Sequence, residues 1–272
     1  MNQFQHYDFQ LQLILALLAT FILMFALFFF MTYYSRYRRI KKSRTKIYYQ
    51  EIIDKVLFDL LFDEHTDPST AAAIFKTKTQ NHRIASKLGL KSLMVLHRNY
   101  SGQLRLKLES FYVQSGLSQY SFNKLNSRDW SKVVEGIRDL STMNHQPAYK
   151  AISDQLRHPK LVVRSEAFIA LVVLRGTEEL QKLRNSDLYL DDWAQSNILY
   201  NLKRTAMKPP THPQHLLESP NETIRLLAAR LIEYYQMFQH TGAIENAIVT
   251  TGNNTLRNKL QIVLNRIKNE QP

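Results

Sequence analysis

Residues 147–175 read PAYKAISDQLRHPKLVVRSEAFIALVVLR, and this stretch decides the fold. Pro147 and Pro159 stand where a helix can begin but cannot continue, so the segment divides into a short helix and a longer one that begins near Leu161. Apolar side chains of the longer helix recur every three or four residues, as on one helix face. One such helical pair cannot bury its apolar face alone and therefore needs neighbours of the same kind.

The pattern of the longer helix recurs along the chain. Six copies begin at residues 104, 133, 163, 193, 224 and 256, so that successive copies are 29 to 32 residues apart, those at 133 and 193 being weaker. Shorter helices are expected before the better copies, at 147–157, 177–184, 213–218 and 241–249. A period of this length is typical of stacked helical repeats. The sequence therefore predicts an all-α fold in which residues 101–272 form a solenoid of about five or six helical pairs.

The best copy resembles a HEAT repeat. The second helix of that family typically opens Asp-Pro-x-x-x-Val-Arg and continues with alanines three and six residues after the arginine. Pro159, Val163, Arg164, Ala167 and Ala170 match this pattern. The resemblance extends over roughly residues 80–268 and implies a curved helical scaffold, while it indicates little about function.

One position departs from the family pattern. The aspartate six residues before the arginine is replaced in four copies, by Asn99, His158, Ser219 and Thr251. In HEAT proteins this aspartate commonly joins the arginine in a ladder between repeats. The resemblance therefore implies that four arginines lack their usual partner: Arg105, Arg164, Arg225 and Arg257. Either they pair with other carboxylates or helix carbonyls, or they form a row that binds an anionic partner.

A long apolar run lies near the N-terminus. Residues 13–31 (LILALLATFILMFALFFFM) include Thr20 as their only polar residue and as a helix would span about 28 Å, close to the thickness of a bilayer core. We therefore predict one transmembrane helix over residues 11–34, after a short extracytoplasmic segment, 1–10. A buried core helix and a cleaved signal peptide are the alternatives. Both are disfavoured, because the run is long, no basic residue precedes it and no Ala-x-Ala site follows.

Basic residues follow the apolar run in a juxtamembrane segment over residues 35–50. Seven lie within eleven residues: Arg36, Arg38, Arg39, Lys41, Lys42, Arg44 and Lys46. The positive-inside rule places them in the cytoplasm, with the N-terminus outside and the rest of the chain inside. We expect them to contact anionic lipid headgroups, a nucleic-acid-binding arm being the alternative. Helical spacing next predicts a helix over 47–63, able to continue the span, and amphipathic helices over 51–100 that cap the solenoid.

Two clusters have metal-ligand residue types. Asp63-Glu64-His65 with Asp67 is one, but adjacent helical residues do not converge on one ion, and the cluster lies at a helix end. His212 and His215 have a zinc-like spacing without an acidic third ligand nearby in the sequence. We therefore expect no metal site. The chain has no cysteine, which excludes disulfides and cysteine nucleophiles, and no glycine-rich phosphate loop.

A third cluster, Asp191-Asp192-Trp193, contains a carboxylate and an aromatic residue, the types that HEAT-like DNA glycosylases use on a concave basic surface, but no motif of this chain matches that family specifically. A simpler explanation is that an aspartate here caps a helix, and that Trp193 occupies the apolar position held by Val163 and belongs to the core. The sequence therefore favours a protein that is not an enzyme and that takes no cofactor or small-molecule substrate.

The net charge of +13 predicts attraction to a negative partner. With the expected anchor and solenoid, it favours a membrane-tethered, non-catalytic scaffold or adaptor. Its cytoplasmic surface would bind a membrane-associated protein, and anionic lipid headgroups would be its second contact. A membrane enzyme or secretion complex is one kind of client. The alternative is a tethered nucleic-acid-binding or glycosylase-like module, and a third hypothesis is a lyase-like protein that acts on a bound cofactor.

Overall fold

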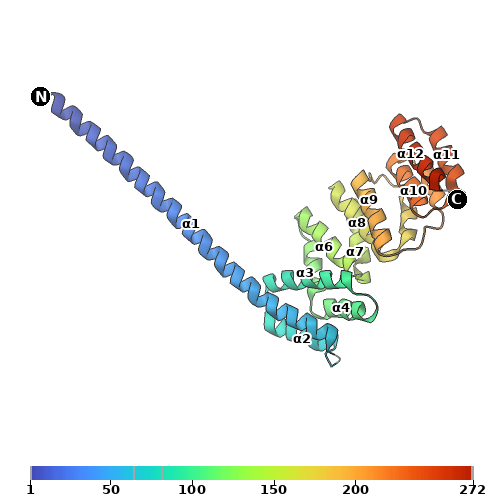
Figure 1. Ribbon diagram of the computed structural model, residues 1–272, viewed down its shortest axis with the longest axis horizontal. Helices are drawn as coiled ribbons and strands as arrows, with labels where there is room; N and C mark the ends of the chain where they lie inside the picture. The colour runs from blue at the N-terminus through green and yellow to red at the C-terminus, as the bar shows by residue number, and fades with distance from the viewer. Residues whose placement is uncertain (1, 64, 81, 271–272) are drawn as a thin grey trace.

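The structure is a computed structural model that describes residues 2–63, 65–80 and 82–270. Every regular element within these residues is a helix, which confirms the all-α prediction. The first helix, α1 (Asn2–Phe62), has 61 residues and extends far from the rest of the chain (Figure 1). At 1.5 Å per residue it is about 90 Å long. The remaining helices form the body of the protein, which begins beside the C-terminal end of α1 and extends away from it (Figure 1).

The apolar run lies in the N-terminal half of α1. It is long and apolar enough to cross a membrane, and its most apolar stretch is not buried against the rest of the protein. The helix expected over 47–63 is the last part of the same α1, so the two predicted helices join without a break. Ile53, Val56, Leu57 and Leu60 on this last part are buried and attach α1 to the body.

The body consists of α-helices and, after α6, several short 3-10 helices. In chain order these are α2 (Pro68–Thr79), α3 (Arg83–Asn99), α4 (Gly102–Gln114), α5 (Leu117–Leu125), α6 (Trp130–Thr142), η1 (Gln146–Ala148), α7 (Tyr149–Asp154), η2 (Gln155–Arg157), α8 (Leu161–Arg175), η3 (Thr177–Leu183), α9 (Asp192–Arg204), η4 (Pro213–Glu218), α10 (Glu222–Tyr234), η5 (Phe238–His240), α11 (Thr241–Thr250) and α12 (Asn254–Glu270). The six longer helices expected from self-comparison are α4, α6, α8, α9, α10 and α12. The shorter ones are α7, η3, η4 and α11, of which η3 and η4 are 3-10 helices.

Neighbouring helices pack in succession from α1 to α12 (Figure 1). α1 contacts α2 and α3, α5 contacts α6, α6 contacts α8, α8 contacts α9, and α10 contacts α12. Two hydrophobic clusters result, and α8 contributes to both, with Ala167 and Leu171 in the first and Phe168 and Val172 in the second. The longer helix of residues 147–175 is α8, and it joins the two halves of the core.

Side-chain caps explain where several helices begin. Asp67 Oδ1 accepts a hydrogen bond from the backbone N–H of Thr70 at 2.9 Å and caps α2. Asp129 caps α6 and Asn221 caps α10 in the same manner. Each cap satisfies a backbone donor that the first turn of a helix leaves free.

The approach of α5 to α6 depends on Gly136. A Cβ at this position would lie 2.5 Å from the backbone nitrogen of Leu125 and 2.8 Å from the carbonyl oxygen of Ser121. We expect Gly136→Ala to lower the free energy of unfolding by about 1–3 kcal/mol, because the two backbones must separate, although alanine is ordinarily the better helix former. Circular dichroism of the full chain in detergent during heating measures the effect.

Gly242→Ala in α11 is the matched control, because a Cβ there would meet nothing within 4 Å. It is expected to leave stability unchanged or to raise it by up to about 1 kcal/mol. An unfolding midpoint for Gly136→Ala at or above that of the wild type would contradict the close approach of α5 and α6.

Candidate functional site

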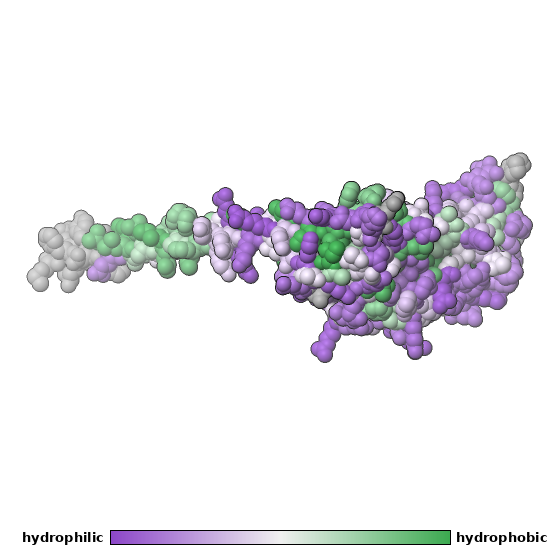
Figure 2. All heavy atoms as spheres, turned by 90° about the horizontal axis from the view of Figure 1, so that it is seen from below, coloured by the Kyte–Doolittle hydropathy of each residue, from purple (hydrophilic) through white to green (hydrophobic). Residues whose placement is uncertain are grey.

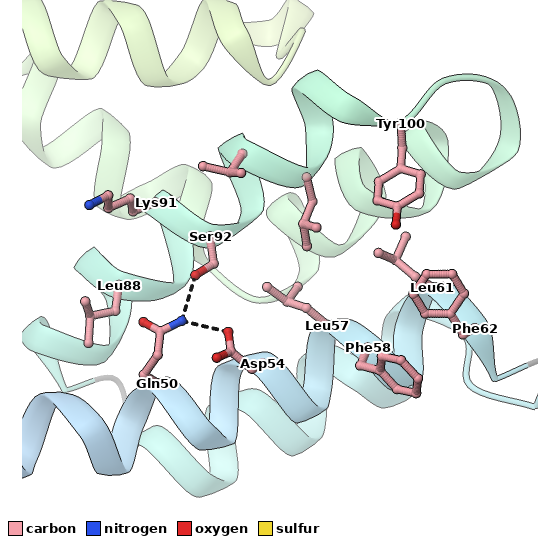
Figure 3. A pocket seen from close by; sticks show the side chains of 12 residues that line it. Gln50, Asp54, Leu57, Phe58, Leu61, Phe62, Leu88, Lys91, Ser92 and Tyr100 are labelled. Carbon is pink, nitrogen blue, oxygen red and sulfur yellow. Dashed lines mark hydrogen bonds between the residues drawn. The ribbon is translucent and has the colours of Figure 1, made fainter.

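An apolar groove lies between the last turns of α1 and the facing side of α3 (Figure 3). Its volume is about 470 Å³. The groove is lined by Gln50, Asp54, Leu57, Phe58, Leu61 and Phe62 of α1, by Leu88, Lys91, Ser92, Val95 and Leu96 of α3, and by Tyr100. A mainly apolar recess with a few polar groups at its edge is the usual form of a binding site.

The groove exists because α1 has more apolar residues than the core uses. Leu57 and Leu61 are buried and form its floor. Phe58 and Phe62, one turn apart, remain 62% and 55% exposed, and Val95 of α3 is exposed on the opposite wall. The two phenylalanine rings contact each other with centroids 5.0 Å apart. These residues therefore present apolar surface to solvent at a place where the core is already complete.

Polar side chains close one end of the groove. Gln50 Nε2 donates hydrogen bonds to Asp54 Oδ1 at 2.6 Å and to Ser92 Oγ at 3.1 Å, and thereby links α1 to α3 (Figure 3). Lys91 lies on the same side of the groove. This end can hydrogen-bond a polar group of a bound segment, while the phenylalanine end can bury apolar side chains.

The face of α1 that forms the groove continues toward the apolar run. Tyr33, Ile40 and Ile47 precede Asp54 and Leu61 at intervals of seven residues, so all five lie along one side of the helix. Tyr33, Ile40 and Ile47 are exposed. Figure 2 shows hydrophobic surface both on the N-terminal part of α1 and on the body near the end of that helix. Three exposed apolar side chains on this side of α1, with basic residues between them, thus lie between the membrane-length segment and the groove.

The four arginines singled out by the sequence each have neighbours of their own. Arg105 Nε donates to His97 Nε2 at 3.1 Å and lies 3.4 Å from Glu109. Arg257 Nη2 donates to the carbonyl oxygen of Thr251 at 2.7 Å.

Arg164 and Arg225 lie 4.0 Å from Asp187 and Glu222 respectively, and the Nε atom of each is buried without a hydrogen-bond partner. The four arginines thus contact carboxylates, a histidine, an asparagine amide and a backbone carbonyl. An anionic partner on them stays a prediction.

The metal-type clusters have structural roles. Asp63 accepts hydrogen bonds from Thr66 Oγ1 at 2.7 Å and from the backbone of His65 at 3.0 Å, and closes the turn after α1. Glu64 lies outside the described residues. Hydrogen bonds from Thr70 and Ser69 lower the pKa of Asp67, the cap of α2, to about 2. The rings of His212 and His215 stack 5.1 Å apart. Within the part of the chain that the structure describes, no three His, Asp or Glu residues are placed to share a metal ion.

The cluster at the start of α9 differs from its prediction in one respect. Asp191 caps α9 through the N–H of Ala194 at 2.8 Å, as expected. Asp192 binds Arg230 at 2.8 Å and Lys259 at 3.1 Å, and hydrogen bonds from these two cations lower the pKa of its carboxyl. Trp193, expected in the core, is 53% exposed.

The reason is a register shift of one residue in α9. The buried side chains of this helix are Ala194, Gln195, Ile198 and Leu202, so the apolar face begins one position after the tryptophan. The repeat pattern placed the apolar face at 193–194, 197 and 200. Of these residues Ala194 is buried, Asn197 is half-buried, and Trp193 and Tyr200 are exposed. This copy was among the weakest in the sequence, and its polar residues at 197 and 201 were the available sign of the shift.

Comparison of the chain with protein-family models, with curated proteins and with solved structures finds no match. What the groove binds is therefore inferred from its own residues.

Substitutions in the groove distinguish the contribution of its exposed wall to stability from that of its buried floor. We expect Phe58→Ala with Phe62→Ala to change the free energy of unfolding by less than about 1 kcal/mol, because both rings are largely solvated. Leu57→Ala is expected to lower it by about 2–5 kcal/mol, because that side chain is buried. Thermal unfolding of the full-length variants in detergent measures both. A large loss of stability in the double phenylalanine variant would show that the rings belong to the core.

Proposed function

We propose that the chain is a membrane-tethered, non-catalytic adaptor with its N-terminus outside and its helical body in the cytoplasm. The apolar run of α1 would cross the bilayer, and the seven basic residues that follow it would hold their end of the helix at the cytoplasmic surface. The helical pairs of the body, arranged as HEAT-like repeats, would then present a fixed surface close to the membrane. Tethering would raise the local concentration of that surface near other membrane proteins.

The observation that supports this proposal is that the exposed Tyr33, Ile40 and Ile47 lie on the same side of α1 as the groove. A helix of a second membrane protein that leaves the bilayer beside α1 would follow Tyr33, Ile40 and Ile47 and reach Phe58 in the groove. Helices that pack along one another repeat their contacts about every seven residues, which is the interval between Tyr33, Ile40 and Ile47. The proposed partner segment is therefore the cytoplasmic continuation of a transmembrane helix.

Charge indicates that the partner is a different protein rather than a second copy. Arg36 and Arg44 lie one helical turn to either side of Ile40 on the same face. In a parallel pair of identical helices each arginine would meet its own equivalent, and like charges at an interface oppose pairing. A helix with apolar residues opposite Ile40 and Ile47 and acidic residues at the level of the arginines fits this surface.

The orientation is tested with single cysteines, since the natural chain has none. We expect a membrane-impermeant maleimide to label Gln3→Cys in intact cells, and to label Asn269→Cys only after the membrane is opened. Replacement of the seven basic residues by glutamine should weaken this preference, because they set the orientation. Labelling of Asn269→Cys in intact cells would reverse the proposed topology, and a shortened chain would indicate cleavage.

Partner binding is tested by photocrosslinking in cells. A photoreactive phenylalanine at position 40, 47 or 58 is expected to crosslink to one and the same membrane protein. The matched control is position 42, because Lys42 is exposed on a different side of α1, two residues and about 200° from Ile40. A product that contains only this chain would indicate a second copy, crosslinked nucleic acid would favour the alternative module, and equal crosslinking at position 42 would contradict a specific face.

A further inference from the structure

A second groove lies on the body, where α6, α8 and α9 meet the end of α3. Its volume is about 340 Å³, and its lining combines arginines and aromatic rings with a few aliphatic residues of α8. The polar and aromatic residues that line it are Arg98 of α3, Arg138, Ser141 and Thr142 of α6, Glu166 of α8, and Trp193, Asn197, Tyr200, Asn201 and Arg204 of α9. Among these described residues three are arginines and one is a carboxylate.

The single carboxylate holds one of the three arginines in position. Glu166 is buried, and its Oε2 accepts a hydrogen bond from Arg138 Nε at 2.9 Å, while Oε1 accepts a second one from Nη2. This paired geometry fixes the plane of the guanidinium. It also uses the negative charge of Glu166, so that no other lining carboxylate remains to balance Arg98 and Arg204.

One face of α9 supplies most of the outer wall. Trp193, Asn197, Tyr200 and Arg204 follow one another at intervals of four, three and four residues. The two aromatic rings are exposed, Tyr200 by 62%. Arg204 Nη2 donates to Asn201 Oδ1 at 3.3 Å, and Asn201 Nδ2 donates to the carbonyl oxygen of Asn197 at 2.8 Å. The cation, the amides and the aromatic rings are thus displayed together.

The positive charge at the end of the groove is not balanced. Burial lowers the pKa of the Arg204 guanidinium, and the charges of Arg98 and Arg105 lower it further. Arg105 shares Glu109, but within the described residues no carboxylate lies within 4.0 Å of Arg98 or Arg204. Like charges brought together without a counter-charge raise the energy of the free protein, and a bound anion relieves it.

We propose that this groove binds an extended acidic segment of a protein partner. Carboxylates of the segment would pair with Arg98 and Arg204, its backbone would meet the amide of Asn197, and an apolar or aromatic side chain would pack on Trp193 and Tyr200. The inference names a partner chemistry for the adaptor proposed above and rests on that function.

Two features favour a peptide over a lipid or a nucleic acid. The groove lies on α6, α8, α9 and the end of α3, which Figure 1 shows apart from the N-terminal half of α1, so under the proposed topology the groove is not part of the segment that meets the bilayer headgroups. The groove also contains the buried carboxylate of Glu166 and asparagine amides at its wall, whereas a nucleic-acid site follows the phosphate backbone with a stripe of cations.

The test uses fluorescence of Trp193 in full-length protein in detergent. The chain has two tryptophans, so Trp130→Phe leaves Trp193 as the single reporter. The probe is a twelve-residue peptide of alternating glutamate and alanine that carries one 3-nitrotyrosine, which quenches nearby tryptophan. Saturable quenching is expected at 0.15 M salt. The same peptide with lysine in place of glutamate should not quench.

Charge reversal distinguishes peptide binding in the groove from a general attraction of the acidic peptide to a basic protein. Arg98→Glu with Arg204→Glu is expected to weaken binding at least about tenfold. Arg128→Glu with Lys150→Glu changes the net charge equally at exposed residues outside the groove, and should weaken it less than about twofold.

Three results would overturn the inference: equal weakening in the two double variants, no quenching by the acidic peptide, or stronger competition by a twelve-nucleotide single-stranded DNA than by the unlabelled peptide. The crosslinks at positions 40, 47 and 58 report on the α1 face alone. If those crosslinks form while the peptide fails to bind, the adaptor function stands and this inference falls.

Discussion

The body of the protein depends on the burial of α8 from both sides. Ten of its fifteen residues are buried, and the eight apolar ones divide between two hydrophobic clusters, one built with α6 and the other with α9 and the helices beyond. A helix that faces solvent on one side needs a single apolar stripe, whereas α8 is apolar almost all round, as expected of a helix enclosed by neighbours. Glu166 is the exception within this surface, and its pairing with Arg138 is what makes its burial tolerable.

The same helix also positions the basic groove. Ile169, Ala170 and Val173 of α8 lie in its lining, beneath the aromatic wall of α9 and beside Arg138 of α6. Because these residues lie on a helix fixed in the core, the floor of the groove is held in place, and the exposed side chains of the wall are carried by α9. The apolar groove has a similar construction, since buried Leu57 and Leu61 anchor α1 while Phe58 and Phe62 stay at the surface. In both cases one helix contributes to the core and to a surface recess through adjacent residues.

Helix positions could be predicted from the sequence, because apolar periodicity and prolines at the joints are local properties. The helices that begin at Leu161 and Glu222 are examples. The orientation of a weak helix was less predictable, since Trp193 and Ala194 compete for the same apolar position and only packing against α8 decides between them. The grooves could not be predicted. Arg98 and Arg204 are far apart in the chain, and no local pattern indicates that they line one recess. Phe58 and Phe62 resemble core residues of an amphipathic helix until α3 is placed beside them.

The unbroken course of α1 has a mechanical consequence. A helix without a hinge transmits rotation as well as position, so a turn of its N-terminal half about its own axis turns the body by the same angle. A tilt of α1 within the membrane moves the body through a larger distance, because the body lies at the far end of a helix about 90 Å long. Loss of three residues from the basic stretch would shorten α1 by only ~4.5 Å but would swing both recesses by ~60° around it. The direction in which the body faces is therefore encoded in the residue count between the apolar run and Gln50, independently of which amino acids fill that interval.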